Sequence, residues 1–227
     1  MSVDAESREF CPLGRLGAGP AVSVWFCILA LPLGFGLTVM VLHYIRRVDG
    51  PIVMMDVNAI PWRPAYYGLG SLLGYLLWGA SVSIGAFAGS ALWGIGRRRA
   101  SMLLFAVASS SLLVLVDDML MLHERLPRAL ELAIYLSYGL ICIAILLAAR
   151  RILLAHEPIL LAAALGALAS AVVVDLLFPF ELRWSVIVED TLKLCGQSLW
   201  LAYFARLAYR ELRLAAGELG QTPHVGV

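Results

Sequence analysis

Residues Ser101–Leu122 read SMLLFAVASSSLLVLVDDMLML and follow closely on a basic turn, Arg97–Arg99. This stretch can cross a bilayer as one helix, because about 20 mainly apolar residues at ~1.5 Å each match the hydrocarbon thickness. Other stretches fit the same rule: Ala21–Tyr44, Tyr67–Gly94, Ala129–Ala149, Pro158–Leu177 and Ser185–Ala205. The sequence therefore predicts an all-α fold, an integral membrane bundle of about six transmembrane helices.

The composition supports a bilayer as the solvent of this chain. Its 227 residues are 61% hydrophobic and only 15% charged, against roughly one quarter charged in soluble domains. The formal net charge is +1, and no basic run interleaved with aromatic residues is present. Because nucleic-acid binding needs such a positive surface, the sequence excludes a nucleic-acid partner.

Arginine placement predicts the orientation of the spans, since positive residues near span ends are retained on the cytoplasmic side. One face of the bundle receives Arg97–Arg99, Arg150, Arg151 and the arginines that follow the last span. The opposite face receives fewer, so both termini are expected to be cytoplasmic. The chain then divides into a cytoplasmic N-terminal segment (1–20), the six-span bundle (21–210) and a cytoplasmic, disordered tail (211–227).

Two features of the first half concern packing. The second span carries Gly70, Gly74, Gly85 and Gly89, and small residues four apart let helix backbones approach closely. They fit ordinary packing inside the bundle, and they also leave open an oligomer formed through this glycine-rich helix. The proline-containing loop Ile45–Tyr66 is expected on the surface.

Ionisable residues gather at one level of the predicted bundle. The third span ends in VDDMLMLHE, the fifth ends near an aspartate, and the sixth begins with two acids and a lysine. Under the six-span topology all of them fall in the outer half of the bilayer, where charged residues cost roughly 2.5–3.5 kcal/mol each on insertion scales. The predicted cluster contains Asp117, Asp118, His123, Glu124, Asp175, Glu189, Asp190 and Lys193.

Lys193 is the single lysine of the chain. It lies about nine residues into its helix, and hence ~13 Å from the helix start, so we expect it to pair with a carboxylate. Glu189 and Asp190 precede it by four and three residues and share its side of the helix. An alternative is that the acids are merely a solvated helix end and favourable residues at a helix N-terminus.

A metal site is the first functional interpretation of this cluster. Carboxylates and a histidine that project inward from neighbouring helices are typical ligands of metal centres in helical bundles. The candidate ligands of a divalent metal ion are Asp117, Asp118, His123, Glu124, Asp175, Glu189 and Asp190, and the candidate catalytic residues are Asp118, His123 and Lys193. Such a site predicts a metal-dependent membrane enzyme that acts on a lipid-like substrate drawn from the bilayer.

Two other classes of function stay open. Carboxylate and lysine relays also mark proton- or ion-coupled transporters. Alternatively, Lys193 and its acids form a buried salt-bridge network in a membrane scaffold or accessory subunit.

The motifs DDxxxxHE (Asp117 to Glu124) and EDxxKxxGxxxW (Glu189 to Trp200) resemble those of a type of small, uncharacterised bacterial multi-pass membrane protein. The resemblance implies no activity. It agrees with the location that we expect, a bacterial-type inner membrane.

Overall fold

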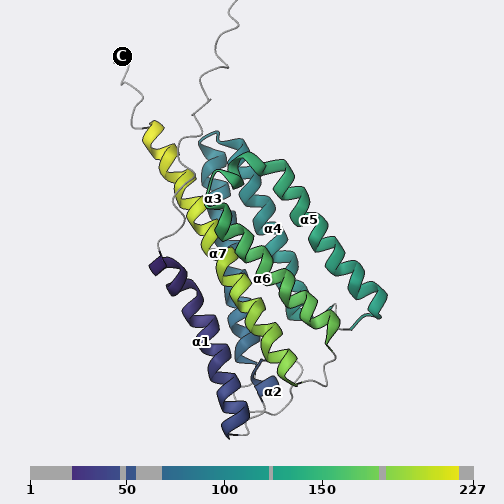
Figure 1. The fold of residues 1–227 in the computed structure, drawn as a ribbon. Coiled ribbons are helices and arrows are strands. Elements are labelled where there is room, and N and C mark those ends of the chain that lie inside the picture. The colour runs from purple at the N-terminus through teal and green to yellow at the C-terminus, as the bar shows by residue number, and fades with distance from the viewer. Residues whose placement is uncertain (1–21, 47–49, 55–67, 123–124, 179–182, 220–227) are drawn as a thin grey trace, which may run out of the picture.

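The computed structural model describes residues 22–46, 50–54, 68–122, 125–178 and 183–219. All regular elements among them are helices, which confirms the predicted all-α fold. They are α1 (Val22–Arg46), α2 (Gly50–Met54), α3 (Leu69–Gly94), α4 (Arg98–Leu120), α5 (Arg128–Leu154), α6 (Pro158–Leu177) and α7 (Arg183–Leu219). The six long helices correspond to the six predicted spans and run roughly alongside one another (Figure 1).

Five of the described helices are long and apolar enough to cross a membrane: α3, α4, α5, α6 and the part of α1 from Ile28 to Arg46. The longer α7 is more polar than these five, since it carries Glu189, Asp190 and Lys193 in its first half. The protein is thus built as a multi-pass membrane protein, with α7 as its most polar long helix.

Helix α7 is also the centre of the bundle. It packs against α1, α2, α3, α4 and α6, and Leu199, Tyr203 and Leu207 on it are fully buried. The main apolar core lies between these residues and the inner faces of α3, α4 and α6, where Leu104 and Leu160 are buried. In a bundle surrounded by lipid, the most polar long helix is buried at the centre, because the hydrocarbon region holds no water to solvate exposed charges.

Helix α5 lies at one side of this core and meets it through its C-terminal half, which includes Leu153. Among the described helices it touches only α4 and α6, and Glu131 and Leu153 alone of its residues are buried. Near its C-terminal end the backbone of Ala149 leaves the helical conformation, with φ −113° and ψ 17°. Figure 1 shows α5 on the outer side of the bundle, away from α7.

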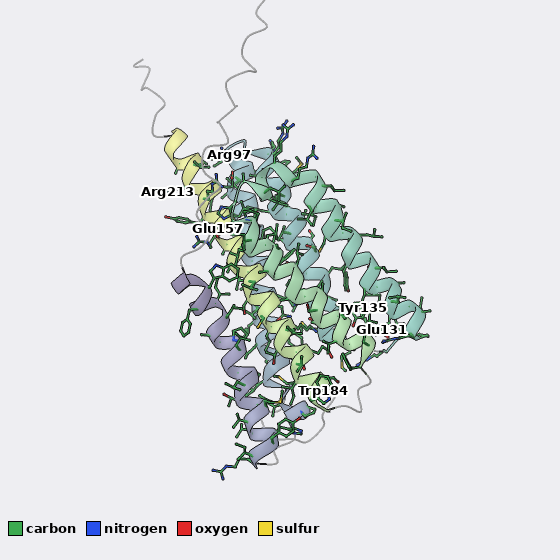
Figure 2. All side chains as sticks on the ribbon, in the orientation of Figure 1. Arg97, Glu131, Tyr135, Glu157, Trp184 and Arg213 are labelled. Atoms are coloured by element: carbon green, nitrogen blue, oxygen red, sulfur yellow. The ribbon has the colours of Figure 1, made fainter. Side chains whose placement is uncertain are left out.

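The bundle has two unlike ends. We call one the arginine-rich end: it holds the α3–α4 turn, the α5–α6 turn and the C-terminal part of α7. Figure 2 labels Arg97, Glu157 and Arg213 there. The other is the carboxylate end, where α4 and α6 finish and α5 and α7 begin, and where Figure 2 labels Glu131, Tyr135 and Trp184.

The glycines of α3 are used inside the chain. Gly70 faces α2, Gly74 faces α7, and Gly85 and Gly89 face α4. A methyl group at Gly85 would lie 3.0 Å from the backbone oxygen of Leu104, so glycine at this position helps α3 and α4 to approach closely. The face that the sequence offered for an oligomer is therefore covered within the chain.

Two expectations need correction. Part of the loop expected on the surface forms α2, in which Val53 and Met54 are buried against Val186 and Ile187 of α7; the apolar run Ile52–Met54 explains this. In addition, α7 remains helical to Leu219, whereas a disordered tail was expected from residue 211, because leucine, alanine and arginine favour helix.

Candidate functional site

A cavity of about 530 Å³ lies between α4, α5, α6 and α7, with Trp78 of α3 in its wall. Most of its lining is apolar and includes Leu113, Val114, Cys142, Leu146, Leu168 and Val172. On α6 the lining extends from Asp175 to Leu165, ten residues or ~15 Å of helix. The cavity exists because α5 approaches the bundle without packing closely against α7.

All the polar groups of the cavity that can ionise lie toward the carboxylate end. They are Asp117 and Asp118 of α4, Tyr135 and Tyr138 of α5, Asp175 of α6, and Glu189 and Lys193 of α7. Four helices therefore bring charged or phenolic groups to one end of an otherwise apolar space.

These groups are arranged in pairs across helices. The Lys193 ammonium lies 2.9 Å from Oδ1 of Asp118 and donates a hydrogen bond to it. The Tyr135 hydroxyl donates to Oδ2 of Asp175 at 2.9 Å, and Tyr138 interacts electrostatically with Asp117. Each pair joins an acidic group to a group that can give or return a proton.

The end of α4 fixes the two aspartates. Met121 has a left-handed backbone, with φ 52°, and the N–H groups of Met121 and Leu122 donate to the carbonyl oxygens of Asp118 and Asp117. This Schellman motif ends α4 at Leu120. The Tyr75 hydroxyl of α3 also donates to the Asp118 carbonyl oxygen at 3.3 Å, so the backbone that carries the aspartates is held from several sides.

Two tryptophans line the cavity further toward the arginine-rich end. The Trp200 indole donates to Oγ of Ser111 at 3.1 Å, and the Trp78 and Trp200 rings meet edge to face, 6.2 Å apart. Trp78 is 4% exposed, and its indole Nε1 has no hydrogen-bond partner among the described residues. A buried donor without a partner costs free energy, so this indole nitrogen is a destabilising feature of the described fold.

The structure brings five of the residues predicted for the site to one cavity: Asp117, Asp118, Asp175, Glu189 and Lys193. Asp190 is on α7 beside them but is not part of the lining. The ion pair expected for Lys193 forms with Asp118 of α4. His123 and Glu124 lie outside the described residues.

The metal site stays a prediction. Within the described part of the chain, no three His, Cys, Asp or Glu side chains come together in a group that could hold a metal ion. The two predicted ligands that would add to such a group, His123 and Glu124, fall in the gap between Leu122 and Arg125.

The sequence analysis missed Tyr135 and Tyr138. Both lie on α5, whose sequence has the pattern of an ordinary apolar span. They are three residues apart and therefore share a face of the helix. The available signal for their role was this spacing near the start of a span, at the same level of the bundle as the acids of other helices.

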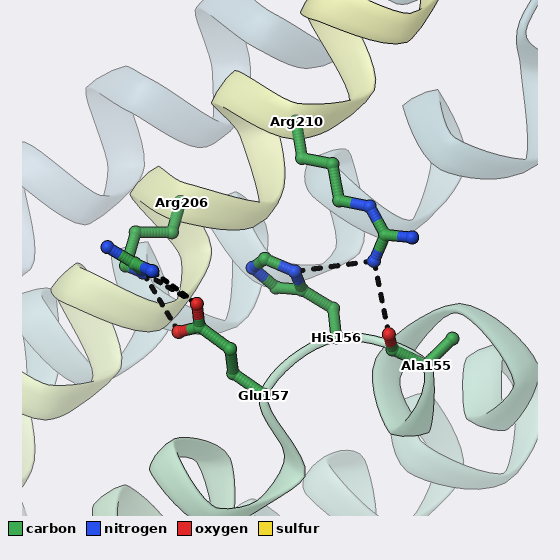
Figure 3. A network of polar contacts seen from close by, with 5 residues as sticks. All are labelled: Ala155, His156, Glu157, Arg206 and Arg210. Carbon is green, nitrogen blue, oxygen red and sulfur yellow. Dashed lines mark hydrogen bonds and ion pairs between the residues drawn. The ribbon is translucent and has the colours of Figure 1, made fainter. Parts of the chain in front are cut away.

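A second polar cluster closes the arginine-rich end (Figure 3). Glu157 is buried in the α5–α6 turn and receives hydrogen bonds from Arg206 of α7 through both of its oxygens. Arg210 donates to the Ala155 carbonyl oxygen at 3.1 Å, and one of its guanidinium nitrogens lies 3.4 Å from Nδ1 of His156. This cluster ties the turn to α7, and none of its residues lines the cavity.

His156 lies in this turn between the two helices and is 9% exposed. Burial lowers the pKa of its imidazole, and the nearby Arg210 and Arg206 lower it further, although Glu157 opposes them. Its ring packs against that of Tyr203, 5.6 Å between centroids. The neutral imidazole is therefore the form that the fold accommodates.

Comparison with known proteins connects the chain with one family. A family model described as a domain of unknown function, DUF8692, matches residues 24–207. The match runs from α1 to the part of α7 just beyond Arg206, so it includes every helix that lines the cavity. No curated protein and no solved structure matches the chain.

Proposed function

We propose that this chain, which belongs to the DUF8692 family, is a membrane-embedded protein that takes a lipid-like substrate from the bilayer into its cavity and acts on the polar part by acid–base chemistry. The observation that carries the proposal is the cavity itself. It is apolar along most of its length and has ionisable groups at one end, which is the shape and polarity of an amphipathic molecule. Pockets of roughly 300–1,000 Å³ are typical of small-molecule sites.

Access from the lipid phase supports this assignment. Helix α5 forms one wall of the cavity, and only Glu131 and Leu153 of its residues are buried. Gly139 of α5 lines the cavity, and a side chain added there would meet nothing within 4 Å. A molecule with a long apolar part can thus pass beside α5 without leaving the hydrocarbon layer.

The paired groups at the polar end supply the chemistry. A carboxylate held by a tyrosine hydroxyl, as Asp175 is by Tyr135, can accept a proton from a reacting group, while the hydroxyl keeps the carboxylate in position. Lys193 beside Asp118 adds a positive charge near the same point. Proton transfer to or from a bound head group, with Lys193 holding developing negative charge, is the reaction step that these residues support.

We further propose a bacterial-type inner membrane, with both termini on the cytoplasmic side. The arginine-rich end carries Arg97, Arg98 and Arg99 in a short turn, and such turns are retained on the cytoplasmic side. The polar end of the cavity then lies in the outer half of the membrane.

A transport function is the second candidate. It is favoured by the excess of carboxylates over amines in a space inside the bundle, because such groups bind and release protons along transport pathways. A transporter would move the cavity's ligand across liposome membranes in a pH-dependent way, whereas an enzyme would release a chemically altered product.

Filling the cavity tests the proposal. Gly139→Phe places a large side chain in its wall, and Gly166→Phe is a matched control, since Gly166 is also an exposed helix glycine with nothing within 4 Å but does not line the cavity. Both changes favour helix, by up to about 1 kcal/mol. Mass spectrometry of purified protein should find a retained lipid-like molecule in the wild type and in Gly166→Phe, and little in Gly139→Phe. Equal retention in all three proteins would contradict the proposal.

A further inference from the structure

We infer that the arginine-rich end of the bundle binds an anionic phospholipid through exposed arginines of α4 and α5. We call this surface the α4–α5 arginine patch, and its residues are Arg98, Arg99, Arg150 and Arg151. The inference goes beyond the proposed function, because none of these residues lines the cavity. The ligand is a component of the surrounding membrane rather than a substrate.

Two adjoining helices bring the four arginines to one end of the bundle. Helix α4 begins at Arg98, and α5 ends at Leu154, shortly after Arg151. The two helices touch one another, and both of these helix ends lie at the arginine-rich end (Figure 1). All four arginines are exposed. The patch therefore presents its positive charges at the level where α4 and α5 leave the hydrocarbon layer.

The acids at this end are already used within the fold. Glu157 pairs with Arg206, and Glu211 pairs with Arg97. These two are the acids at this end whose side chains the structure describes. Within the described part of the chain, no arginine of the patch forms an ion pair. The patch thus carries positive charge that an anionic ligand can compensate.

One guanidinium of the patch is held in a fixed orientation. Cζ of Arg98 lies 3.6 Å from the centre of the Trp93 ring, and Trp93 is itself exposed. A ring that stacks on a guanidinium fixes its plane and leaves the N–H groups at its edge able to donate to a phosphate. Because tryptophan is enriched at the level of the lipid head groups, this pair marks the depth at which a lipid phosphate lies.

Exposed apolar side chains lie about one helical turn deeper than the arginines. On α4, Met102 follows Arg98 by four residues, and on α5, Leu147 precedes Arg151 by four residues. Both apolar side chains are exposed. A lipid whose phosphate meets the arginines can therefore lay its acyl chains along Met102 and Leu147. An acidic protein surface outside the membrane would not contact these side chains, so the arrangement favours a lipid.

Competition between two lipids tests the inference on the full-length wild type. The protein, purified in a non-ionic detergent, is mixed with equal amounts of phosphatidylglycerol and phosphatidylcholine that carry the same acyl chains. Native mass spectrometry then counts the lipids of each kind that stay bound. One arginine near an anionic lipid strengthens binding about fivefold, so we expect at least this preference for phosphatidylglycerol.

Variants assign the preference to the patch. Arg150→Gln combined with Arg151→Gln should reduce it severalfold, and Arg99→Gln tests the same patch from α4 if the double variant fails to fold. The matched control is Arg46→Gln combined with Arg125→Gln, which also removes two exposed arginines. Arg46 ends α1 and Arg125 follows α4, and among the described helices α1 touches neither α4 nor α5. The control should keep the preference, and Tm shows whether each variant is folded.

The same count in Gly139→Phe separates this inference from the proposed function. A lipid held by the patch stays bound when the cavity is filled, so the preference should persist in that variant. Its loss there would place the counted lipid in the cavity and overturn the patch.

The other outcomes decide the inference as well. Equal binding of the two lipids by the wild type would overturn it and leave an acidic protein surface as the partner. Equal losses in the patch variant and the control would overturn it too, because the effect would then follow the net charge of the protein. An unchanged preference in every variant would show that the lipid binds elsewhere.

Discussion

The two ends of this bundle hold similar residues in opposite arrangements. At the arginine-rich end, Glu157 is buried and both of its oxygens accept hydrogen bonds from Arg206 of α7, so acid and base compensate one another and the turn is closed. At the carboxylate end, one lysine and four carboxylates of the described residues line a cavity. The charged groups of one end therefore close a turn, whereas those of the other end border an open space that can hold a ligand.

Among the variants that test this comparison, the removal of Lys193 should have the largest effect on stability. Lys193→Met leaves Asp118, whose side chain is 8% exposed, without its ion-pair partner, and orphaning a buried charge costs about 3–5 kcal/mol of unfolding free energy. Thermal unfolding of the detergent-solubilised protein should show a large fall in Tm.

The control is Arg128→Met at the same end of the bundle. Arg128 pairs with Glu131 at 2.6 Å, but its side chain is 58% exposed, so solvent replaces much of what the pair provides. Equal shifts of Tm in the two variants would show that the Lys193 pair is no more important to the fold than a surface pair.

An intermediate effect on the free energy of unfolding is expected at the arginine-rich end. Glu157→Gln keeps the shape of the side chain but removes the charge that pairs with Arg206. Because the Arg206 side chain is 40% exposed, the loss should be only about 1–2 kcal/mol. Binding in the cavity should be unaffected, and a loss of binding would mean that the two ends are coupled. Glu211→Gln, whose partner Arg97 is more distant at 3.2 Å, should lower Tm less.

The smallest expected effect is a pH dependence of the stability that arises from His156. Its pKa is lowered from 6.5 in the folded protein, so below pH 6.5 the unfolded chain binds the proton more readily and the folded state loses stability as pH falls. The stabilisation is complete above pH 6.5, and its loss is at most about 1.4 kcal/mol per pH unit. Tm measured between pH 7.5 and 5 should therefore fall more steeply in wild type than in His156→Phe, which keeps the ring against Tyr203. Parallel curves would contradict the assignment.

Much of the fold followed from the sequence because hydropathy and length are properties of single spans. The position of the ionisable cluster along the bundle could also be predicted, since the topology alone puts the end of α4, the end of α6 and the start of α7 at the same end of the bundle. The pairing of Lys193 with Asp118 could not be predicted, because it depends on how each helix is rotated about its axis. The spacing of Tyr135 and Tyr138 on one face of α5 could be seen in the sequence, but their contact with the acids depends on where α5 stands in the bundle.

The interrupted backbone at Ala149 bears on how fast the cavity exchanges its contents. It lies in the last turns of α5, near the end where Leu153 is buried, while the rest of the helix has few neighbours. A helix can bend most easily where its backbone hydrogen bonding is interrupted. We therefore expect the residence time of a bound molecule to be set by the motion of α5, so that stiffening position 149 slows association and dissociation together and leaves the affinity nearly unchanged.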